Sequence, residues 1–344
     1  MIRLRLATIA ALAVALPSVS AVAQDAADFF RGRHITLIVG TGPGGGYDSY
    51  GRLFAQHFSR HLPGEPRVIV QNMPGASGIT ATNYLYSLAE KTGSVIGTVN
   101  QSIALRQLMR EPAVRFDAAK LNWLGAMSSS VTVFIVWKDA GIVTLEDAKR
   151  KEVTMGATGA AGGNAIFPRI VNSQLGTRFK PVTGYQAGAD ILLAMERREV
   201  DGMGSMNWTA LKAGWPQWFT DKSFNTVLQI GLTRDPDLPN VPLLIDLAGN
   251  ETQKALFHLI SADTIMGWPI VAPPDVPADR LALLRKAFSD TMADPVLLAD
   301  ADKRKMEIIN PSSGDAVQAV VRSVLATPPD VVAIFTEMSK PEGK

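Results

Sequence analysis

Backbone N–H groups in three glycine-rich loops are the most specific chemistry that this sequence offers. The loops are residues 44–48, 75–78 and 159–164, and each follows an apolar run and precedes a helical pattern. Successive N–H groups in a tight glycine turn form a concave set of donors, and the positive end of the next helix adds to its attraction for anions. The loops therefore predict a cleft for a ligand with one or more carboxylates. The alternative interpretation is that the glycines only make tight turns between strands and helices.

A dinucleotide site is a second alternative for the first loop, because Gly40, Gly42 and Gly45 have the G-x-G-x-x-G spacing. That fingerprint also needs an acidic residue at the end of the second strand, to hold the ribose hydroxyls. The second predicted strand ends at Gln71 instead. Pro43 also removes one N–H donor from the turn. The sequence therefore disfavours nucleotide binding.

Residue types for covalent or metal catalysis are scarce. The chain has no cysteine and four histidines, none in an H-E-x-x-H pattern, so we expect no thiol nucleophile, no metal site and no cofactor. Ser77 and Ser205 are the candidate nucleophiles of an exported hydrolase. Neither serine lies in a G-x-S-x-G elbow or beside a histidine. We expect a binding protein, with a hydrolase as the alternative from a different class.

The elements that must position these loops read as repeated strand, glycine turn and helix. Apolar runs predict strands, and spacings of three and four residues predict amphipathic helices. Glycines and serine at residues 202–205 are interpreted as a turn that follows a short strand near Val200. The predicted strands are residues 35–39, 67–71, 95–99, 131–137, 153–155 and 226–232, and the predicted helices lie near residues 46–58, 79–88, 165–175, 188–196, 277–292 and 317–324.

The first residues have the pattern of an export signal. Arg3 and Arg5 precede the apolar run 6–16, and an A-x-A segment ends at Ala23. We expect residues 1–23 to be a signal peptide cleaved near Ala23, which predicts a periplasmic protein. Without those two arginines the formal net charge of +2 becomes zero, which argues against a nucleic-acid partner.

Length and composition predict two coupled globular domains. The chain has 344 residues, of which 47% are hydrophobic and 19% charged, as in a globular protein with a sizeable core. We expect the extended run at 131–137 to carry the chain into a second unit. The predicted first domain is discontinuous, with residues 24–130 and 235–344, and the second is residues 131–234. Two crossings between domains suit hinge closure around a ligand.

Two consecutive segments resemble a known family. Residues 43–48 read P-G-G-G-Y-D and residues 70–78 read V-Q-N-M-P-G-A-S-G, which resemble the P-G-G-x-x-D and V-x-N-x-P-G-A-x-G motifs of the substrate-binding proteins of tripartite tricarboxylate transporters, the Bug family. Weaker similarity continues at residues 184–188, 238–242 and 268–288, so nearly the whole mature chain is covered.

The resemblance implies an α/β fold, the two-domain, type II periplasmic binding protein that closes like a Venus flytrap. It implies no catalysis. It implies capture of a small carboxylate-containing solute and its delivery to the membrane permease subunits of such a transporter, and we expect the receptor to be a monomer. The ligand-binding residues that it implies, by position in the motifs, are Gly44, Gly45, Gly46, Tyr47, Asp48, Ala76, Ser77, Gly78, Thr158, Gly159, Gly162, Gly163, Asn164, Ala187, Gly188, Ser205 and Asn207.

Three questions stay open at the level of sequence. Asp48 either caps the helix that begins beside it or accepts a hydrogen bond from the ligand or a bridging water. Trp208, next to Asn207, is the one residue of the tryptophan cluster that we place in the cleft, although packing between helices also accounts for such a cluster. A periplasmic sensor that presents its closed form to a signalling kinase is the alternative to a transport receptor.

Overall fold

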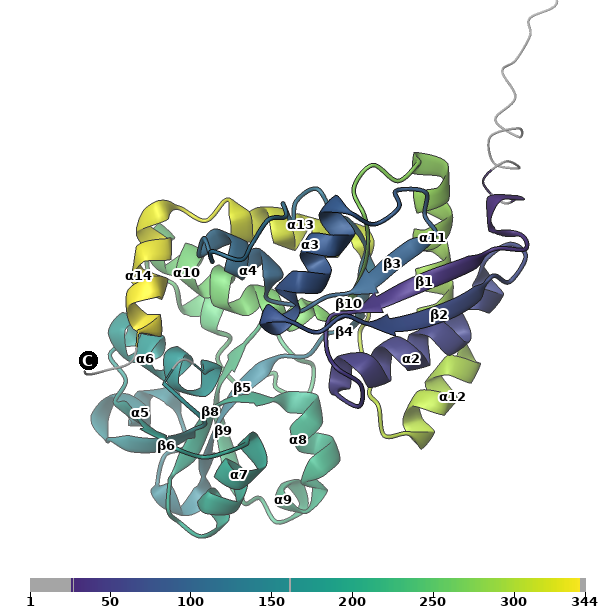
Figure 1. The fold of residues 1–344 in the computed structure, drawn as a ribbon. Coiled ribbons are helices and arrows are strands. Elements are labelled where there is room, and N and C mark those ends of the chain that lie inside the picture. The colour runs from purple at the N-terminus through teal and green to yellow at the C-terminus, as the bar shows by residue number, and fades with distance from the viewer. Residues whose placement is uncertain (1–25, 27, 161, 341–344) are drawn as a thin grey trace, which may run out of the picture.

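The protein is described by a computed structural model that covers residues 26, 28–160 and 162–340. The predicted signal peptide and its cleavage site at Ala23 lie outside the described residues. Two separate β-sheets, each with its own helices, organise the described chain (Figure 1). The mixed α/β class predicted from the sequence is confirmed.

The first sheet has six strands in the order β11-β4-β10-β3-β1-β2. Strands β1, β2 and β3 run parallel, and β10 runs antiparallel to both β3 and β4. The strands are β1 (His34–Val39), β2 (Arg67–Asn72), β3 (Val95–Thr98), β4 (Asn122–Ser128), β10 (Gly267–Ala272) and β11 (Ser312–Ser313).

Helices cover both faces of this sheet, because successive strand residues point to opposite faces and those of β1 are buried on both. Leu37 and Val39 of β1 pack with one group of helices, while Ile38 between them packs with the other. The first group is α2 (Gly46–Phe58), α11 (Ala278–Met292) and α12 (Pro295–Lys303), and the second is α3 (Ile79–Ser87), α4 (Ile103–Leu108), α10 (Glu251–Ser261) and α13 (Gly314–Leu325).

The second sheet has five strands in the order β7-β6-β8-β5-β9. Its strands are β5 (Thr132–Trp137), β6 (Val153–Ala157), β7 (Phe179–Thr183), β8 (Gly202–Asn207) and β9 (Phe224–Ile230). Phe134 and Met155 face a core that includes α6, whereas Ile135 faces a core that includes α7 and α8. The helices of this unit are α5 (Leu145–Arg150), α6 (Gly163–Leu175), α7 (Gly188–Glu196), α8 (Trp208–Gly214) and α9 (Pro216–Thr220).

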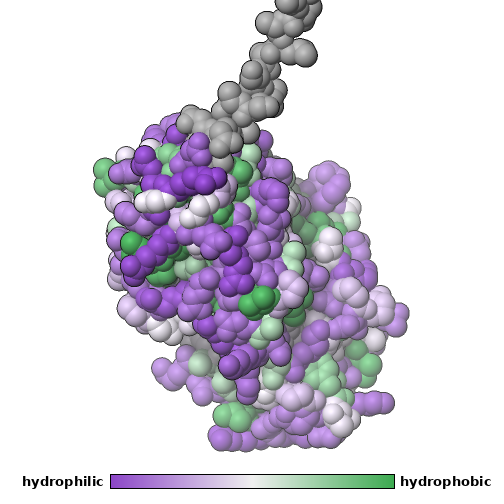
Figure 2. Space-filling view, turned by 90° about the vertical axis from the view of Figure 1, so that its right-hand side faces the viewer, coloured by the Kyte–Doolittle hydropathy of each residue, from purple (hydrophilic) through white to green (hydrophobic). Residues whose placement is uncertain are grey.

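The chain passes from the first sheet to the second between β4 and β5 and returns after β9. The C-terminal helix α14 (Pro329–Ser339) then lies beside both α10 and α6, so it joins helices that belong to different sheets (Figure 1). Among the described helices, none is singly long and apolar enough to cross a membrane; α13 and α14 meet that length and composition only as a pair bent by 88°. One face of the molecule is mostly hydrophilic, with apolar residues in small scattered groups (Figure 2).

The interpretation of residues 202–205 as a turn was wrong, because they form most of strand β8. Their glycines serve close packing. A Cβ on Gly202 would lie 2.3 Å from the carbonyl oxygen of Ile135, and one on Gly204 would lie 2.6 Å from the ring of Pro168. Contacts below 3 Å force neighbouring atoms to move, so this strand needs glycine where propensity alone disfavours it.

Candidate ligand-binding site

A cavity of about 760 Å³ lies where the two sheets meet. Its lining includes the last residue of β4 and residues two to four positions after β3 and β4, together with the last residues of β8 and the first residue of α6. In α/β sheets, ligands bind outside the carboxyl ends of the strands, where loops diverge. The cavity therefore occupies the place that the fold provides for a ligand.

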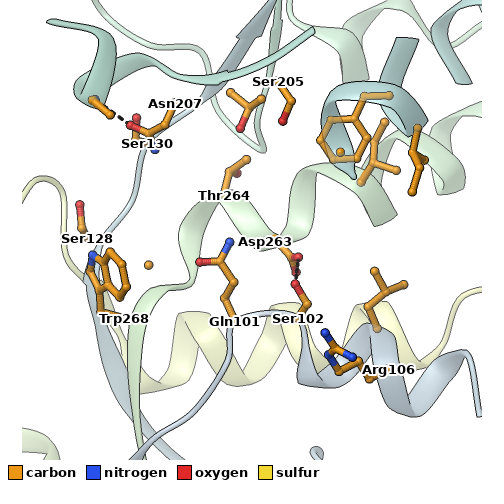
Figure 3. A pocket seen from close by; sticks show the side chains of 18 of the residues that line it. Gln101, Ser102, Arg106, Ser128, Ser130, Ser205, Asn207, Asp263, Thr264 and Trp268 are labelled. Atoms are coloured by element: carbon orange, nitrogen blue, oxygen red, sulfur yellow. Dashed lines mark hydrogen bonds between the residues drawn. The ribbon is translucent and has the colours of Figure 1, made fainter. Parts of the chain in front are cut away.

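Hydroxyl and amide side chains dominate one part of the lining (Figure 3). Ser205 and Asn207 come from the second sheet, whereas Gln101 and Ser102 come from the segment after β3 on the opposite side of the cavity. Figure 3 also shows Ser130, in the connection between the sheets, beside Asn207. These groups can both donate and accept hydrogen bonds, which suits a polar solute.

The N-terminus of α6 adds backbone donors to this polar region. Gly163 is the first residue of that helix and lines the cavity, so its N–H belongs to the donors that a helix leaves without intrahelical partners. A Cβ on Gly163 would lie 3.2 Å from Oγ of Ser205. The small residue therefore lets the helix end approach the Ser205 hydroxyl closely.

Asp263 supplies a carboxylate to the cavity from the 3₁₀ turn η5 (Ala262–Ile265) after α10. The hydroxyl of Ser102 donates to its Oδ2 at 2.5 Å, as Figure 3 shows. Burial raises the pKa of Asp263, and the Ser102 hydrogen bond and the charge of Arg106 offset part of that rise. Its neighbour Thr264 also lines the cavity.

Arg106 of α4 is the one cationic side chain among the described lining residues, and it is already paired. Its Nη1 lies 3.0 and 3.1 Å from the two carboxylate oxygens of Glu111, which also lines the cavity. The ion pair between Arg106 and Glu111 neutralises the two charges, and an apolar part of the lining lies beside it. The apolar side chains there are Leu105, Met109, Ile166, Phe167, Ile260 and Phe335.

Trp268 forms an aromatic wall of the cavity, with a backbone φ of 54° that is uncommon outside glycine. Tyr50 stacks on its ring with centroids 4.3 Å apart and planes inclined by 13°, and Tyr47 meets it edge-on at 4.8 Å. Gly46 makes room for the ring, because a Cβ there would lie 2.7 Å from Cη2 of Trp268. The glycine of the first loop is thus a packing requirement.

Several predicted residues of the first loop act within the protein. The N–H of Gln101 donates to the phenolic oxygen of Tyr47 at 3.0 Å, and burial, the largest cause, raises the pKa of Tyr47 to about 12. Gly44 and Gly45 are exposed and are not among the lining residues of the cavity. The partly buried Tyr47 thus holds the backbone of Gln101 at the cavity.

Asp48 is buried within a hydrogen-bond network. It accepts from the N–H of Gly44 at 2.9 Å, from Nε of Arg52 at 3.0 Å and from Nδ2 of Asn72 at 2.8 Å. The Arg52 hydrogen bond is the largest cause that lowers the pKa of Asp48 to about 2. Of the two roles left open for Asp48, capping of the following helix is not what the structure shows, since Asp48 is itself the third residue of α2 and accepts from Gly44, the residue before the N-cap.

Apart from Gly163, the predicted residues of the other loops are not among the lining residues of the cavity. Ala76, Ser77 and Gly78 all have positive φ and form a tight turn, η2 (Ala76–Gly78), before α3. The side chain of Asn164 accepts from the N–H of Thr158 at 3.3 Å, which closes the loop that also contains Gly159 and Gly162. The exposed Ala187 is the N-cap of α7, and Gly188 begins that helix.

Trp208 packs inside the second unit. Its ring meets Phe219 edge-on at 5.3 Å and lies 6.5 Å from Phe224, and only 5% of its surface is exposed. Of the residues predicted to bind ligand, the structure places Gly163, Ser205 and Asn207 in the cavity lining. The ligand contacts themselves stay a prediction for all of the predicted residues.

Sequence reasoning missed most of the lining. Gln101 and Ser102 had a usable signal, because polar residues directly after a buried strand occupy the ligand edge of a sheet. Asp263 lies 161 residues from its partner Ser102, and Trp268 comes from a strand, β10, that the sequence did not predict. No local pattern brings these residues together.

Two covered sheets with a polar cavity at the strand ends between them define a two-lobed binding protein. The family comparison agrees, since residues 51–327 match the model of the tripartite tricarboxylate transporter family receptor, TctC. The chain belongs to this family, and the resemblance seen in its glycine motifs is confirmed.

Solved structures show the same fold at low sequence identity. A TctC solute-binding protein from Polaromonas, solved without ligand, is 19% identical, with a TM-score of 0.68 over 89% of this chain and 98% of that one. The periplasmic binding protein BugD is 18% identical, with a TM-score of 0.54 over 91% and 99%.

Two further neighbours carry ligands. MatC from Rhodopseudomonas palustris with bound malate is 15% identical, with a TM-score of 0.52 over 90% of this chain and 100% of that one. An R. palustris protein with adipate is 17% identical, with a TM-score of 0.54 over 89% and 98%. The predicted periplasmic-binding-protein fold is confirmed.

Proposed function

We propose that this protein is a periplasmic receptor that captures a small carboxylate-containing solute between its two lobes and delivers it to a transporter of the tripartite tricarboxylate type. The lobes are residues 24–130 with 235–344, and residues 131–234. The signal peptide is removed near Ala23. The observation that carries the proposal is the polar part of the cavity, where Gly163 at the N-terminus of α6 lies beside the Ser205 hydroxyl and Asn207 lines the same cavity.

A carboxylate fits this region for physical reasons. The free N–H groups at a helix N-terminus carry partial positive charge, and side-chain hydroxyls add neutral donors. Such a site holds an anion without a lysine or arginine. The malate and adipate in the R. palustris neighbours support this ligand class. The predicted loops around residues 44–48, 76–78 and 158–164 would complete the site when the lobes close.

The matching family is one of transporter receptors, which favours delivery to a permease over presentation to a signalling kinase. A hydrolase that uses Ser205 or Ser77 is the other rival. Saturable binding without chemical change supports the receptor, whereas turnover of a carboxylic ester by the purified protein would support the hydrolase.

A thermal-shift screen tests the proposal. The protein is unfolded and refolded to remove any ligand carried through purification, then screened against aliphatic, hydroxylated and aromatic carboxylates, with NAD and sugars as controls. A ligand at 100 times its Kd stabilises the folded state by about 2.7 kcal/mol. Ser205→Ala is expected to reduce the shift for the ligand that binds. Stabilisation by NAD alone, or by no carboxylate, would refute the proposal.

A further inference from the structure

The charges that line the cavity are unbalanced. The charged side chains among the described lining residues are Arg106, Glu111, Asp263 and Glu307. Arg106 bonds Glu111 through its Nη1, and its charge also lowers the pKa of Asp263, but without a salt bridge between the two. In the described part of the chain, no salt bridge joins Asp263 or Glu307 to a cation. A solute that carries only negative charge therefore enters a cavity that already holds unpaired carboxylates.

Asp263 differs from Glu307 in its surroundings. The Glu307 backbone bonds the Tyr50 hydroxyl through both its N–H and its carbonyl, at 2.9 and 3.2 Å, and Tyr50 in turn stacks on Trp268. Asp263 lies between the two lobes, and Ser102 donates to one of its oxygens. The other oxygen, Oδ1, receives no hydrogen bond from the described residues. It is the acceptor that the protein leaves for a ligand.

We propose that Asp263 is a specificity-determining residue that accepts a hydrogen bond from a protonated amine of the bound solute. The ligand class is then a carboxylate that also carries an ammonium group. The inference rests on the proposed function, because it assigns a second group to the solute whose carboxylate meets the α6 N-terminus. Ser102 fixes the orientation of Asp263 by donating to Oδ2, so Oδ1 stays directed to the solute.

Electrostatics explains why an ammonium group is selected. A carboxylate with little access to water is costly in its charged form unless a cation meets it, and burial already raises the pKa of Asp263. A ligand ammonium supplies that cation and also lowers the net negative charge of the solute. A second ligand carboxylate near Asp263 would instead meet like charge. Charge-assisted hydrogen bonds of this kind are stronger than neutral ones.

Two sets of matched ligands test the inference by titration calorimetry on the refolded protein. Succinate, malate and aspartate share a four-carbon dicarboxylate chain and carry hydrogen, hydroxyl and ammonium at the same position. Adipate, 2-hydroxyadipate and 2-aminoadipate repeat the comparison with six carbons. In at least one set, we expect the amine to bind about tenfold or more tightly than the member without a substituent.

The variants are Asp263→Asn and, as a matched control, Glu307→Gln. Each removes one lining carboxylate charge with little change of shape, and the amide introduced by Asp263→Asn keeps an oxygen to accept from Ser102. We expect the amine preference to fall below about threefold in Asp263→Asn, and to persist in Glu307→Gln. Unchanged preference in Asp263→Asn, or equal loss in both variants, would overturn the assignment to Asp263.

The outcomes separate this inference from the proposed function. Binding of dicarboxylates without preference for the amine leaves the receptor function standing and overturns only the inference. Preference for the hydroxyl member over the amine overturns it as well, because a hydroxyl needs no charged acceptor. Failure of all six ligands, and of the wider carboxylate screen, refutes the proposed function and the inference with it.

Discussion

Replacing Gly46 with alanine tests whether the first glycine loop serves packing. The added Cβ would lie 2.7 Å from Cη2 and 3.0 Å from Cζ3 of Trp268. The indole has little freedom to retreat, because Tyr50 stacks on it at 4.3 Å and Tyr47 meets its edge. Its backbone is held at a φ of 54°. Either the ring or the start of α2 must therefore shift.

The expected cost follows from general magnitudes. Overpacking by one methyl group costs about 1–3 kcal/mol. Replacing glycine with alanine also stabilises the folded state by about 0.4–1 kcal/mol, because alanine lowers the conformational entropy of the unfolded chain. The net loss is then roughly 0–2.6 kcal/mol, which lowers the urea midpoint by up to roughly 0.9 M for a slope near 3 kcal/mol per molar. Near-ultraviolet circular dichroism should report the displaced indole.

Gly45→Ala is the matched control for this measurement. Gly45 has a φ of −82°, which alanine adopts without strain, and a Cβ there would meet nothing within 4 Å. Its stability should change by less than about 0.5 kcal/mol, and the aromatic signal should stay the same. Equal stability and equal spectra for Gly46→Ala and Gly45→Ala would refute the packing explanation of the loop.

Three further predictions concern the elements around the cavity. The folded-state pKa of Asp48 is lowered to about 2, so the contribution of its carboxylate to stability is present above its unfolded pKa near 4 and is lost as the pH falls toward 2. In urea unfolding, the difference in stability between wild type and Asp48→Asn should therefore shrink over that pH range. A difference that stays constant would contradict this prediction. Asn207 caps α8 by accepting a hydrogen bond from the N–H of Ala210 at 2.9 Å. Asn207→Ala should therefore lower the free energy of unfolding by about 1 kcal/mol, and Asn207→Ser by much less. Equal losses of stability in the two variants, measured by chemical denaturation, would argue against the cap. Gly204→Ala should destabilise the second unit by about 1–3 kcal/mol, because its Cβ would meet Pro168 at 2.6 Å, and a wild-type urea midpoint would show that α6 moves freely.

The sequence predicted those strands whose local pattern is strong. Strands β1, β2, β5 and β6 are apolar runs, and the runs of β1 and β6 end in glycine turns. Strand β8 was wrongly interpreted as a turn, because its glycines are required by close contacts with residues that are distant in sequence. Strand β10 begins with Gly267, Trp268 and Pro269, of which the glycine and the proline are disfavoured in strands. The strand forms because it pairs with β3 and β4, and local propensity alone does not predict it.

The site could be predicted only in segments whose glycines stand out locally. Gly163 and Ser205 belong to segments that the sequence analysis singled out, and both reach the cavity. Asp263 and Trp268 reach it because the chain returns to the first sheet after the second is complete. That return is a property of topology, and residue spacing does not encode which side chains it brings together.

Glycines in this protein place other residues at the cavity by letting them come close. Gly46 admits the Trp268 ring, Gly163 admits the Ser205 hydroxyl, and a Cβ on Gly78 would lie 3.3 Å from Cβ of Asn100, just before the lining residue Gln101. Backbone donation to a ligand and close packing demand the same residue type, so the motif alone does not separate them. Alanine substitutions do, because a packing glycine affects stability in the absence of ligand, whereas a donor glycine affects only binding.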